Sequence, residues 1–404
     1  MHRHGHGRGE MINRISYMGT KHNLAPAVLG VIETCQPGRV LDAFAGMGSV
    51  AESLAGKRHV WTNDIQHFAH LASACRLADE YGPVSARSLG AATRPLFEQN
   101  LKQLKEQNAE AIRLTRKALK TNDYTSFRTH FDRAQAILPR TEDSYGCFTR
   151  AYSHGYFSIE QCAQIDSIRF ALEMLKGRGS LTARQFDWAI LALGGAILRI
   201  ANTTGHFAQF LKPNAGNLKR VIKQFQREVW SEWLTSIRRL KPVGAPAWRR
   251  NNIATRSDST SLLRSRDYSR LVKVVYCDPP YTDDQYSRYY HVWETLALYD
   301  YPVTTGQGRY RADRYTTTFS LVSKVVEAFR TLIAEVASSG ADIVLSYPSN
   351  GVLHAAGASP LDLMLEIYPD AKIVVETRHS HSTMGASKGS AKSEVIERIY
   401  LGRA

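Results

Sequence analysis

A glycine-rich turn between an expected strand and an expected helix most constrains the fold of this chain. The turn comprises residues 42–48 (DAFAGMG), follows the segment 39–41 (RVL) and precedes helix-compatible residues 49–55. Open α/β sheets use this order of elements to bring backbone amides close to a nucleotide-like ligand. The turn contains GxG and not GxGxxG, which disfavours a dinucleotide pyrophosphate site.

An acidic residue follows the next expected strand. Residues 59–62 (HVWT) form that strand, and Asn63-Asp64 come directly after it. An acid at the end of the second strand, about 20 residues beyond the glycine turn, is placed to accept hydrogen bonds from ribose hydroxyls. The sequence therefore predicts a ligand that carries a ribose.

A third strand end carries the tetrapeptide Asp278-Pro279-Pro280-Tyr281, after the apolar run 271–277 (LVKVVYC). Proline has no backbone N–H and a fixed φ, so two in a row stiffen the chain and leave carbonyls free to accept. The acid adds a further acceptor and the tyrosine adds a flat stacking face. Together they suit a planar amine attached to a base. A simple Pro-Pro turn is the alternative, and the glycine turn and Asp64 at other strand ends favour the ligand site.

With these motifs the sequence resembles the DNA N6-adenine methyltransferases of the alpha group, which transfer a methyl group from S-adenosylmethionine. The order is that of the alpha group: cofactor turn, long insertion, then catalytic motif. The similar segments are residues 17–21 (YMGTK), 42–48, 64, 155–158 (GYFS), 165–169 (IDSIR), 204–207 (TGHF), 278–281 and 285–294 (QYSRYYHVWE). Tyr17 departs from relatives that carry Trp there, and the insertion is unusually long.

The resemblance implies a role for each matching residue. S-adenosylmethionine would contact Tyr17, Lys21, Asp42, Phe44, Gly46, Gly48, Asp64, Asp258 and Asp278. The catalytic residues would be Asp278, Pro279 and Tyr281, and the flipped adenine would be bound by Tyr281, Tyr286 and Tyr290. Asp258 has an equal alternative as a turn-capping residue, and His291 is expected to make a structural hydrogen bond, because an adenine amine needs no general base before attack.

The implied activity is site-specific methylation of the N6 amine of an adenine extruded from duplex DNA. The residues leave open methylation of RNA, methylation of the cytosine N4 amine, and a non-catalytic nucleic-acid-binding relative. Relatives that act on cytosine more often begin the motif with Ser, so Asp278 favours adenine. Relatives of the restriction–modification type further imply a cognate restriction endonuclease as a partner and a bacterial, archaeal or phage origin.

Composition agrees with a polyanionic partner. Lys and Arg number 52 against 37 Asp and Glu, for a net charge of +15, and cations supply affinity for phosphates. No apolar run approaches the roughly 18 residues of a membrane span, and no secretory signal is seen. The five scattered cysteines lack CxxC spacing, which indicates reduced thiols in a cytoplasm and no metal site. Cys277 is expected to be a buried strand residue and not a nucleophile.

The fold class expected is α/β: a Rossmann-like, S-adenosylmethionine-dependent methyltransferase with a mixed sheet, an antiparallel edge strand and a mainly helical insertion. The expected domains are a disordered leader (1–10), the cofactor-binding first part of the core (11–85), the helical insertion for DNA target recognition (86–265) and the catalytic second part of the core (266–404). Helices are expected at 101–119, at 158–175 with Ser158 as N-cap, and at 218–240, and further strands at 341–348, 371–378 and 394–401. The last two would form an antiparallel pair, joined by the loop 379–392, which is expected to grip phosphate, with a mobile hairpin tip as the alternative.

Overall fold

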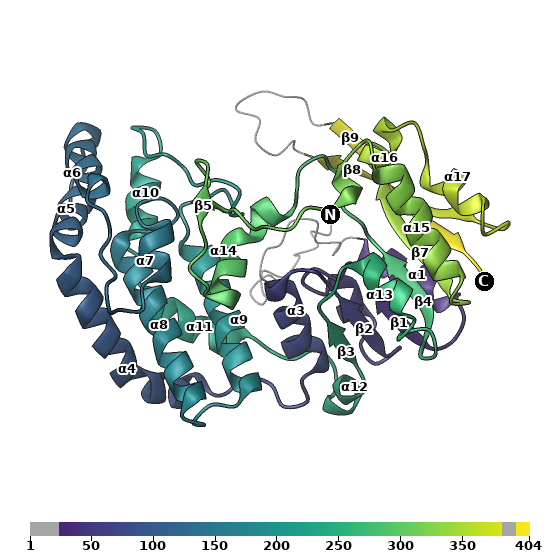
Figure 1. Ribbon diagram of the computed structural model, residues 1–404, viewed down its shortest axis with the longest axis horizontal. Helices are drawn as coiled ribbons and strands as arrows, with labels where there is room; N and C mark the ends of the chain where they lie inside the picture. Colours follow the sequence, from purple (N-terminus) through teal and green to yellow (C-terminus); the bar gives the residue numbers. More distant parts are fainter. Residues whose placement is uncertain (1–23, 382–392) are drawn as a thin grey trace, which may run out of the picture. The chain divides into compact units, whose positions relative to one another are not determined.

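The computed structural model describes residues 24–381 and 393–404, and these divide into two compact units (Figure 1). The sheet unit comprises residues 24–80, 243–287, 315–381 and 393–404. The helical unit comprises residues 81–242 and 288–314. Each unit is therefore built from segments that are distant in the sequence. The expectations for the leader 1–10, for Tyr17 and Lys21, and for the loop tip 382–392 lie outside the described residues.

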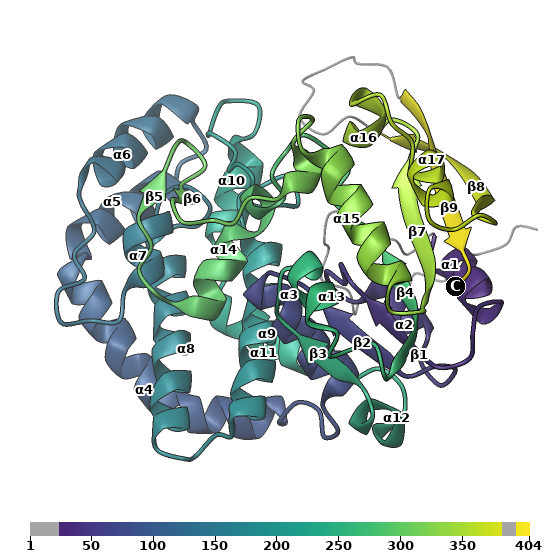
Figure 2. The same ribbon diagram turned by 45° about the vertical axis from the view of Figure 1, so that its right-hand side comes forward.

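A mixed sheet of seven strands forms the centre of the sheet unit, in the order β3-β2-β1-β4-β7-β9-β8 (Figure 2). The strands are β1 (Arg39–Asp42), β2 (Val60–Asn63), β3 (Ile253–Thr255), β4 (Val272–Cys277), β7 (Asp342–Pro348), β8 (Lys372–His381) and β9 (Ser393–Gly402). Strands β3, β2, β1, β4 and β7 are parallel, and β9 pairs antiparallel with both β7 and β8. This is the fold of an S-adenosylmethionine-dependent methyltransferase, with the predicted antiparallel strands at one edge.

Both faces of the sheet are covered, so its central strands are apolar on both sides. On β1, Val40 belongs to an apolar cluster that includes α1 and α2, and Leu41 belongs to a second cluster that includes α13, α15 and α17. On β4, Val274 belongs to the cluster that includes α1 and α2, and Val275 belongs to the cluster that includes α13, α15 and α17. The helical elements of the sheet unit are α1 (Ala25–Glu33), α2 (Ser49–Ser53), α3 (His67–Ser73), the π-helix η2 (Ala74–Ala78), α12 (Pro246–Arg250), α13 (Ser259–Ser265), the 3-10 turn η3 (Thr318–Ser320), α15 (Val325–Ala337), α16 (Val352–Ala355) and α17 (Pro360–Leu365).

The helical unit packs long helices side by side around an aromatic core (Figure 1). Its fully buried side chains include Trp188, Trp233, Trp293, Tyr152 and Tyr156. A small antiparallel pair, β5 (Thr304–Thr305) and β6 (Tyr310–Arg311), follows the last helix. The helices are α4 (Ala86–Gln107), α5 (Ala109–Leu119), α6 (Tyr124–Ala136), α7 (Cys147–Tyr152), α8 (Ile159–Gly177), α9 (Ala183–Ile200), α10 (Leu218–Phe225), α11 (Val229–Arg239) and α14 (Ser287–Leu298).

The two units differ from the expected division at two places. Residues 243–265 belong to the sheet unit, because β3 pairs with β2 and α13 packs on the sheet. Residues 288–314 belong to the helical unit, where His291 and Trp293 are buried in the aromatic core. The apolar pattern alone did not reveal either assignment, since both segments contain ordinary amphipathic helices.

Two expected helices are each divided. The segment 101–119 breaks at Asn108, whose buried side chain is hydrogen-bonded to the backbone N–H and carbonyl of Arg140. The segment 218–240 breaks before Val229, because the Gln164 side chain accepts hydrogen bonds from the first backbone N–H groups of α11. The helix beginning after Ser158 is confirmed, with Ser158 and Gln161 forming a capping box.

Candidate active site

The glycine-rich turn lies where β1 ends and α2 begins. Gly46 and Gly48 have φ values of 50° and 78°, a region that costs most other residues energy. A Cβ on Gly48 would also lie 2.7 Å from a methyl group of Leu77. The turn is tied to its neighbours by backbone bonds from Ala43 to Tyr276 (3.0 Å) and from Ala45 to Asn63 (2.9 Å). The conformation of the turn is therefore fixed from both adjacent strands.

Asp64, at the end of β2, is attached to this turn. One carboxylate oxygen of Asp64 accepts a hydrogen bond from the Gly46 backbone N–H at 2.9 Å, and the other accepts one from the Gln66 N–H at 2.9 Å. The structure thus brings together the two features that the sequence placed at separate strand ends.

Three carboxylates meet at the carboxyl ends of β1, β2 and β4. Asp42 is 2% exposed, and burial, followed by the nearby carboxylates of Asp278 and Asp64, raises its pKa to about 8. One Asp42 oxygen is buried and has no hydrogen-bond partner within the described part of the chain. This edge of the sheet therefore favours a ligand with positive charge.

The tetrapeptide leaves the sheet beside the glycine turn, because β4 pairs directly with β1. Asp278 is partly buried, Pro279 is buried, and the half-buried Tyr281 packs on the core beneath α15. The Tyr281 ring meets the Tyr286 ring edge-on, with centroids 6.2 Å apart. An acid, a carbonyl and two aromatic rings are thereby gathered at one edge of the sheet.

Phe44 and Asp258 lie near the same turn. Phe44 is half-buried, and its ring meets the Phe319 ring edge-on at 5.4 Å. Asp258 is exposed and caps α13 by accepting a hydrogen bond from the Ser261 N–H at 2.9 Å, so the capping alternative is confirmed. The next residue, Ser259, donates to the Ala43 carbonyl at 2.6 Å, which joins this segment to the turn. A cofactor contact by Asp258 stays a prediction.

Tyr290 lies in the helical unit, in contrast to the other expected site residues that the structure describes. It is 1% exposed and stacks on Trp293, with nearly parallel rings 5.9 Å apart. His291 is also buried there, between Tyr152 and Tyr156, and burial lowers its pKa to about 3. The expected structural role of His291 fits its hydrogen bond to the Phe207 carbonyl at 2.9 Å.

Residues at the end of β7 were missed as part of this site. Strand β7 pairs with β4, so its carboxyl end adjoins the tetrapeptide. Buried Ser346 accepts a hydrogen bond from the Tyr276 hydroxyl at 3.1 Å, and the Val352 N–H donates to the Tyr281 carbonyl at 2.9 Å. The available signal was the polar run 346–350 (SYPSN) at the end of an expected buried strand.

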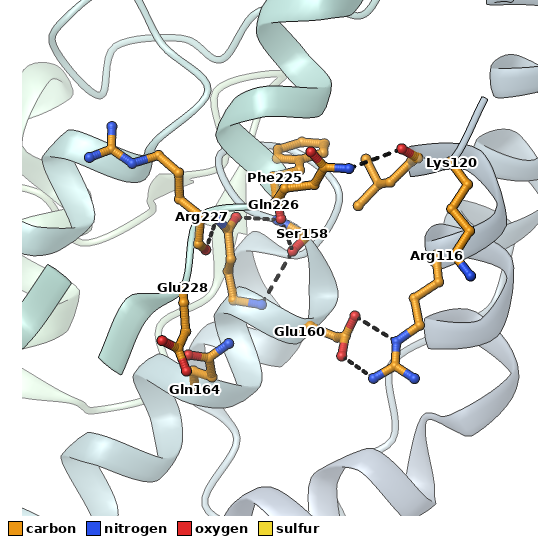
Figure 3. Close-up of a pocket in the computed structure, with 11 residues that line it drawn as sticks. Arg116, Lys120, Ser158, Glu160, Gln164, Phe225, Gln226, Arg227 and Glu228 are labelled. Atoms are coloured by element: carbon orange, nitrogen blue, oxygen red, sulfur yellow. Dashed lines mark hydrogen bonds and ion pairs between the residues drawn. The ribbon is translucent and has the colours of Figure 1, made fainter. Parts of the chain in front are cut away.

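Two pockets lie within the helical unit. One, of about 300 Å³, lies among α5, α8 and the α10–α11 junction (Figure 3). Its polar atoms serve the protein itself: Arg116 pairs with Glu160 in two bonds, and the Gln161 amide donates to the Gln224 and Arg227 carbonyls. The polar side chains that line this pocket therefore connect α8 to α5 and to the α10–α11 junction.

Within residues 24–381 and 393–404, no cluster of His, Cys, Asp and Glu is arranged to hold a metal ion. Cys277 is buried on β4 as expected, and burial raises its thiol pKa well above the ordinary value. Among the described helices, none combines the length and the apolar character that a bilayer crossing requires.

The order and pairing of the strands are consistent with the fold of the S-adenosylmethionine-dependent methyltransferases. Residues 248–342, which include β4 and the tetrapeptide, match the family described as D12 class N6 adenine-specific DNA methyltransferase. This match confirms the resemblance to N6-adenine DNA methyltransferases that the motifs indicated.

Curated relatives point the same way. The chain is 24% identical over 401 residues to Modification methylase LlaI of Lactococcus lactis subsp. lactis, covering 95% of this chain and 54% of that protein. It is 24% identical to Type II methyltransferase M.FokI of Planomicrobium okeanokoites and 23% identical to Modification methylase StsI of Streptococcus sanguinis, covering 83% of this chain in each case and 45% and 44% of those proteins. The chain thus spans about half the length of these relatives.

Proposed function

We propose that this protein is a site-specific DNA methyltransferase that transfers a methyl group from S-adenosylmethionine to the N6 amine of a flipped adenine. The observation that carries the proposal is the pairing of β1 with β4, which brings the glycine turn and the tetrapeptide to the same edge of one sheet. Parallel α/β sheets bind their ligands at the carboxyl ends of the strands. The D12 family match covers the tetrapeptide itself.

The tetrapeptide suits an extruded adenine. The Asp278 carboxylate and the Pro279 carbonyl would accept the two amine hydrogens, while Tyr281 stacks on the base. Accepting both hydrogens directs the nitrogen lone pair outward and stabilises the positive charge that develops on nitrogen during transfer. Asp278 would accept this hydrogen bond as a carboxylate while the sulfur–methyl bond breaks and the nitrogen–methyl bond forms. The extra proton on the methylated nitrogen would then pass along the hydrogen bond to Asp278 and on to water.

The residues around the turn fit S-adenosylmethionine. When bound, this cofactor supplies a methyl group already activated by a positively charged sulfur. Asp64 would hold the ribose hydroxyls, and the Gly46–Gly48 backbone would lie along the cofactor without side-chain obstruction. The buried Asp42 oxygen that lacks a partner among the described residues suits a cationic group of the ligand. Alignment of donor and acceptor would then contribute much of the rate enhancement.

Positive charge in the helical unit supports duplex DNA as the substrate. Lys219 and Lys223 lie on the exposed side of α10, opposite the buried Leu218, Val221 and Phe225. Neither lysine forms an ion pair within the described residues. By contrast, the side chain of Arg227, at the end of the same segment, pairs with Glu232. Unpaired exposed lysines are the groups that gain most from phosphate contact.

A methyl-transfer assay tests the proposal. The purified protein is incubated with methyl-labelled S-adenosylmethionine and mixed-sequence duplex DNA from a host without adenine methylation, or with RNA of matched length. We expect label only in DNA, recovered as N6-methyladenine after digestion to nucleosides. Label in N4-methylcytosine or in RNA would instead establish one of the alternative activities, and DNA binding without any transfer would identify a non-catalytic relative.

The names of the relatives suggest a cellular role. Two of them are called modification methylases and one a type II methyltransferase. We infer that this protein also protects DNA in the bacterial cytoplasm against a cognate restriction endonuclease. Cleavage of unmodified host DNA by a nuclease encoded beside this protein, and resistance after methylation, is the expected result; equal cleavage of both DNAs would exclude the partnership.

A further inference from the structure

The first residue of the short helix α16 forms a hydrogen bond with the backbone of Tyr281. The Val352 N–H donates a hydrogen bond to the Tyr281 carbonyl at 2.9 Å, and Val352 is the first residue of α16. The next residue, Leu353, donates its N–H to the phenol oxygen of Tyr347 at 3.0 Å. The first N–H groups of a helix have no acceptor within the helix. These two bonds therefore determine where α16 begins.

The side chain of Tyr347 is buried and closely packed, although it lies near the end of β7. It is fully buried on β7, and its ring meets the Phe329 ring edge-on at 5.1 Å. A Cβ on Gly351 would approach the Tyr347 ring to 2.4 Å, so the turn before α16 closes directly over the ring. The phenol oxygen has one defined position, and so does the helix start that it accepts from.

We propose that Tyr347 is a positioning residue for methyl transfer, an inference that rests on the function proposed above. Its phenol oxygen fixes the first turn of α16, and α16 fixes the carbonyl of Tyr281. Tyr347 contacts neither substrate nor cofactor in this account. Loss of its oxygen releases the Tyr281 backbone and with it the stacking face for the flipped adenine.

The same core also supports the rest of the catalytic segment and the cofactor turn. The Ser320 hydroxyl, at the end of η3, donates to the Asp284 carbonyl at 3.2 Å, and Gln285 exchanges two hydrogen bonds with the Thr317 backbone. The Phe319 ring of η3 meets Phe44 at 5.4 Å and Phe329 at 5.5 Å. One row of edge-on rings, Phe44–Phe319–Phe329–Tyr347, thus lies behind both halves of the site.

The variant Tyr347→Phe tests the proposal, with Tyr368→Phe as a matched control. Tyr368 is 2% exposed, belongs to the same core, and donates its phenol to the Ala341 carbonyl at 3.1 Å beside the opposite end of β7. Each variant removes one buried phenol oxygen from one hydrogen bond. Both should therefore lower the melting temperature by similar amounts, which separates general stability from positioning.

For Tyr347→Phe we expect kcat to fall about 10- to 100-fold with the KM for S-adenosylmethionine unchanged, because small displacements near the reacting atoms cost rates of this size. Tyr368→Phe should keep the kcat of the unchanged protein. Equal kcat values for the two variants, or a rise in KM without loss of kcat, would overturn the positioning role.

Amide hydrogen exchange provides a readout that needs no activity. Peptides that contain Val352 and Leu353 should exchange faster in Tyr347→Phe and at the normal rate in Tyr368→Phe. If the unchanged protein transfers no methyl group at all, the proposed function fails, and the exchange result alone decides whether Tyr347 holds α16 against Tyr281. Unchanged exchange in Tyr347→Phe overturns the inference in either case.

Discussion

The Asp64 carboxylate accepts a hydrogen bond from the Gly46 backbone N–H at 2.9 Å, across the boundary between two adjacent strands. This bond joins the expected ribose-binding acid to the glycine turn. Because Asp64 also accepts from Gln66, its carboxylate is held at both oxygens. The position of the acid is thus set by backbone groups on either side of it.

Replacement of Asp64 by Asn should weaken cofactor binding. An amide can accept only one of the two backbone hydrogen bonds, and it loses the charge that strengthens bonds from ribose hydroxyls. We expect the dissociation constant for S-adenosylmethionine to rise about tenfold, the effect of about 1.4 kcal/mol. Calorimetry measures it, with Asp123→Ser as the control: Asp123 is an exposed N-cap of α6 in the helical unit, and Ser also caps a helix. An unchanged constant in Asp64→Asn would remove Asp64 from the cofactor site.

Asp278→Ala should abolish methyl transfer and leave DNA binding largely intact. The carboxylate acts on charge that develops only in the transition state, and removal of one such group typically costs about 100- to 1,000-fold in kcat. Single-turnover transfer and a DNA-binding titration measure the two effects separately. Asp283→Asn, an exposed acid five residues onward in the sequence, is the control and should retain its rate. Normal turnover by Asp278→Ala would refute the catalytic role.

Asp42 should make stability and cofactor binding depend on pH in opposite directions. Its pKa is about 8 in the folded protein, against an ordinary value of 3.8. Between these values the folded state holds a proton that the unfolded state has lost, so the free energy of unfolding falls as pH rises from about 4 to about 8. A cationic ligand favours the carboxylate, so its binding should release a proton and strengthen with pH over the same range.

The variant Asp42→Asn isolates this effect, because an amide stays neutral at every pH. Thermal unfolding from pH 5 to pH 8 should be less pH-dependent in the variant than in the unchanged protein. Calorimetry in buffers of different ionisation enthalpy counts the protons released on S-adenosylmethionine binding. Identical pH profiles for the two proteins would show that Asp42 does not titrate in this range.

The double variant Lys219→Ala/Lys223→Ala should weaken DNA binding uniformly across sequences. Each phosphate contact contributes about 0.9 to the slope of log affinity against log salt, so the slope should fall by about 2. The control is Arg94→Ala/Lys102→Ala on α4, where both cations pair with Glu98 and Glu106 one helical turn away. If the slope of log affinity against log salt falls equally in the two double variants, the effect comes from the overall charge of the protein and not from phosphate contacts by α10.

The strand ends were predictable because a buried parallel strand needs an apolar run, and the expected site residues Asp42, Asp64 and Asp278 each lie at the end of such a run. The predicted strands 271–277 and 341–348 correspond to β4 and β7, and the last two predicted strands form the antiparallel pair β8–β9. Strand order was harder to read. Nothing in the local sequence states that 253–255 (IAT) is an edge strand beside β2, since three residues give no periodicity.

Side-chain roles that depend on distant partners could not be read from local patterns. Tyr290 carries the same signal in the sequence as Tyr286, yet it stacks on Trp293 inside the helical unit. Asn108 resembles any helix-surface amide, and only its bonds to Arg140 explain the break between α4 and α5. Tyr347 was seen only as a strand residue, because its acceptor role requires the start of α16 to fold back over it.

The pairing of β1 with β4 also has a consequence for synthesis. Residues 39–42 leave the ribosome long before residues 272–277, and the whole helical segment 81–242 emerges in between. Until β4 arrives, one side of β1 has an unsatisfied row of backbone groups, which is a template for pairing with other chains. Nascent chains that stall before residue 272 are therefore the species most in need of chaperones, and truncation there should yield aggregates and not a cofactor-binding fragment.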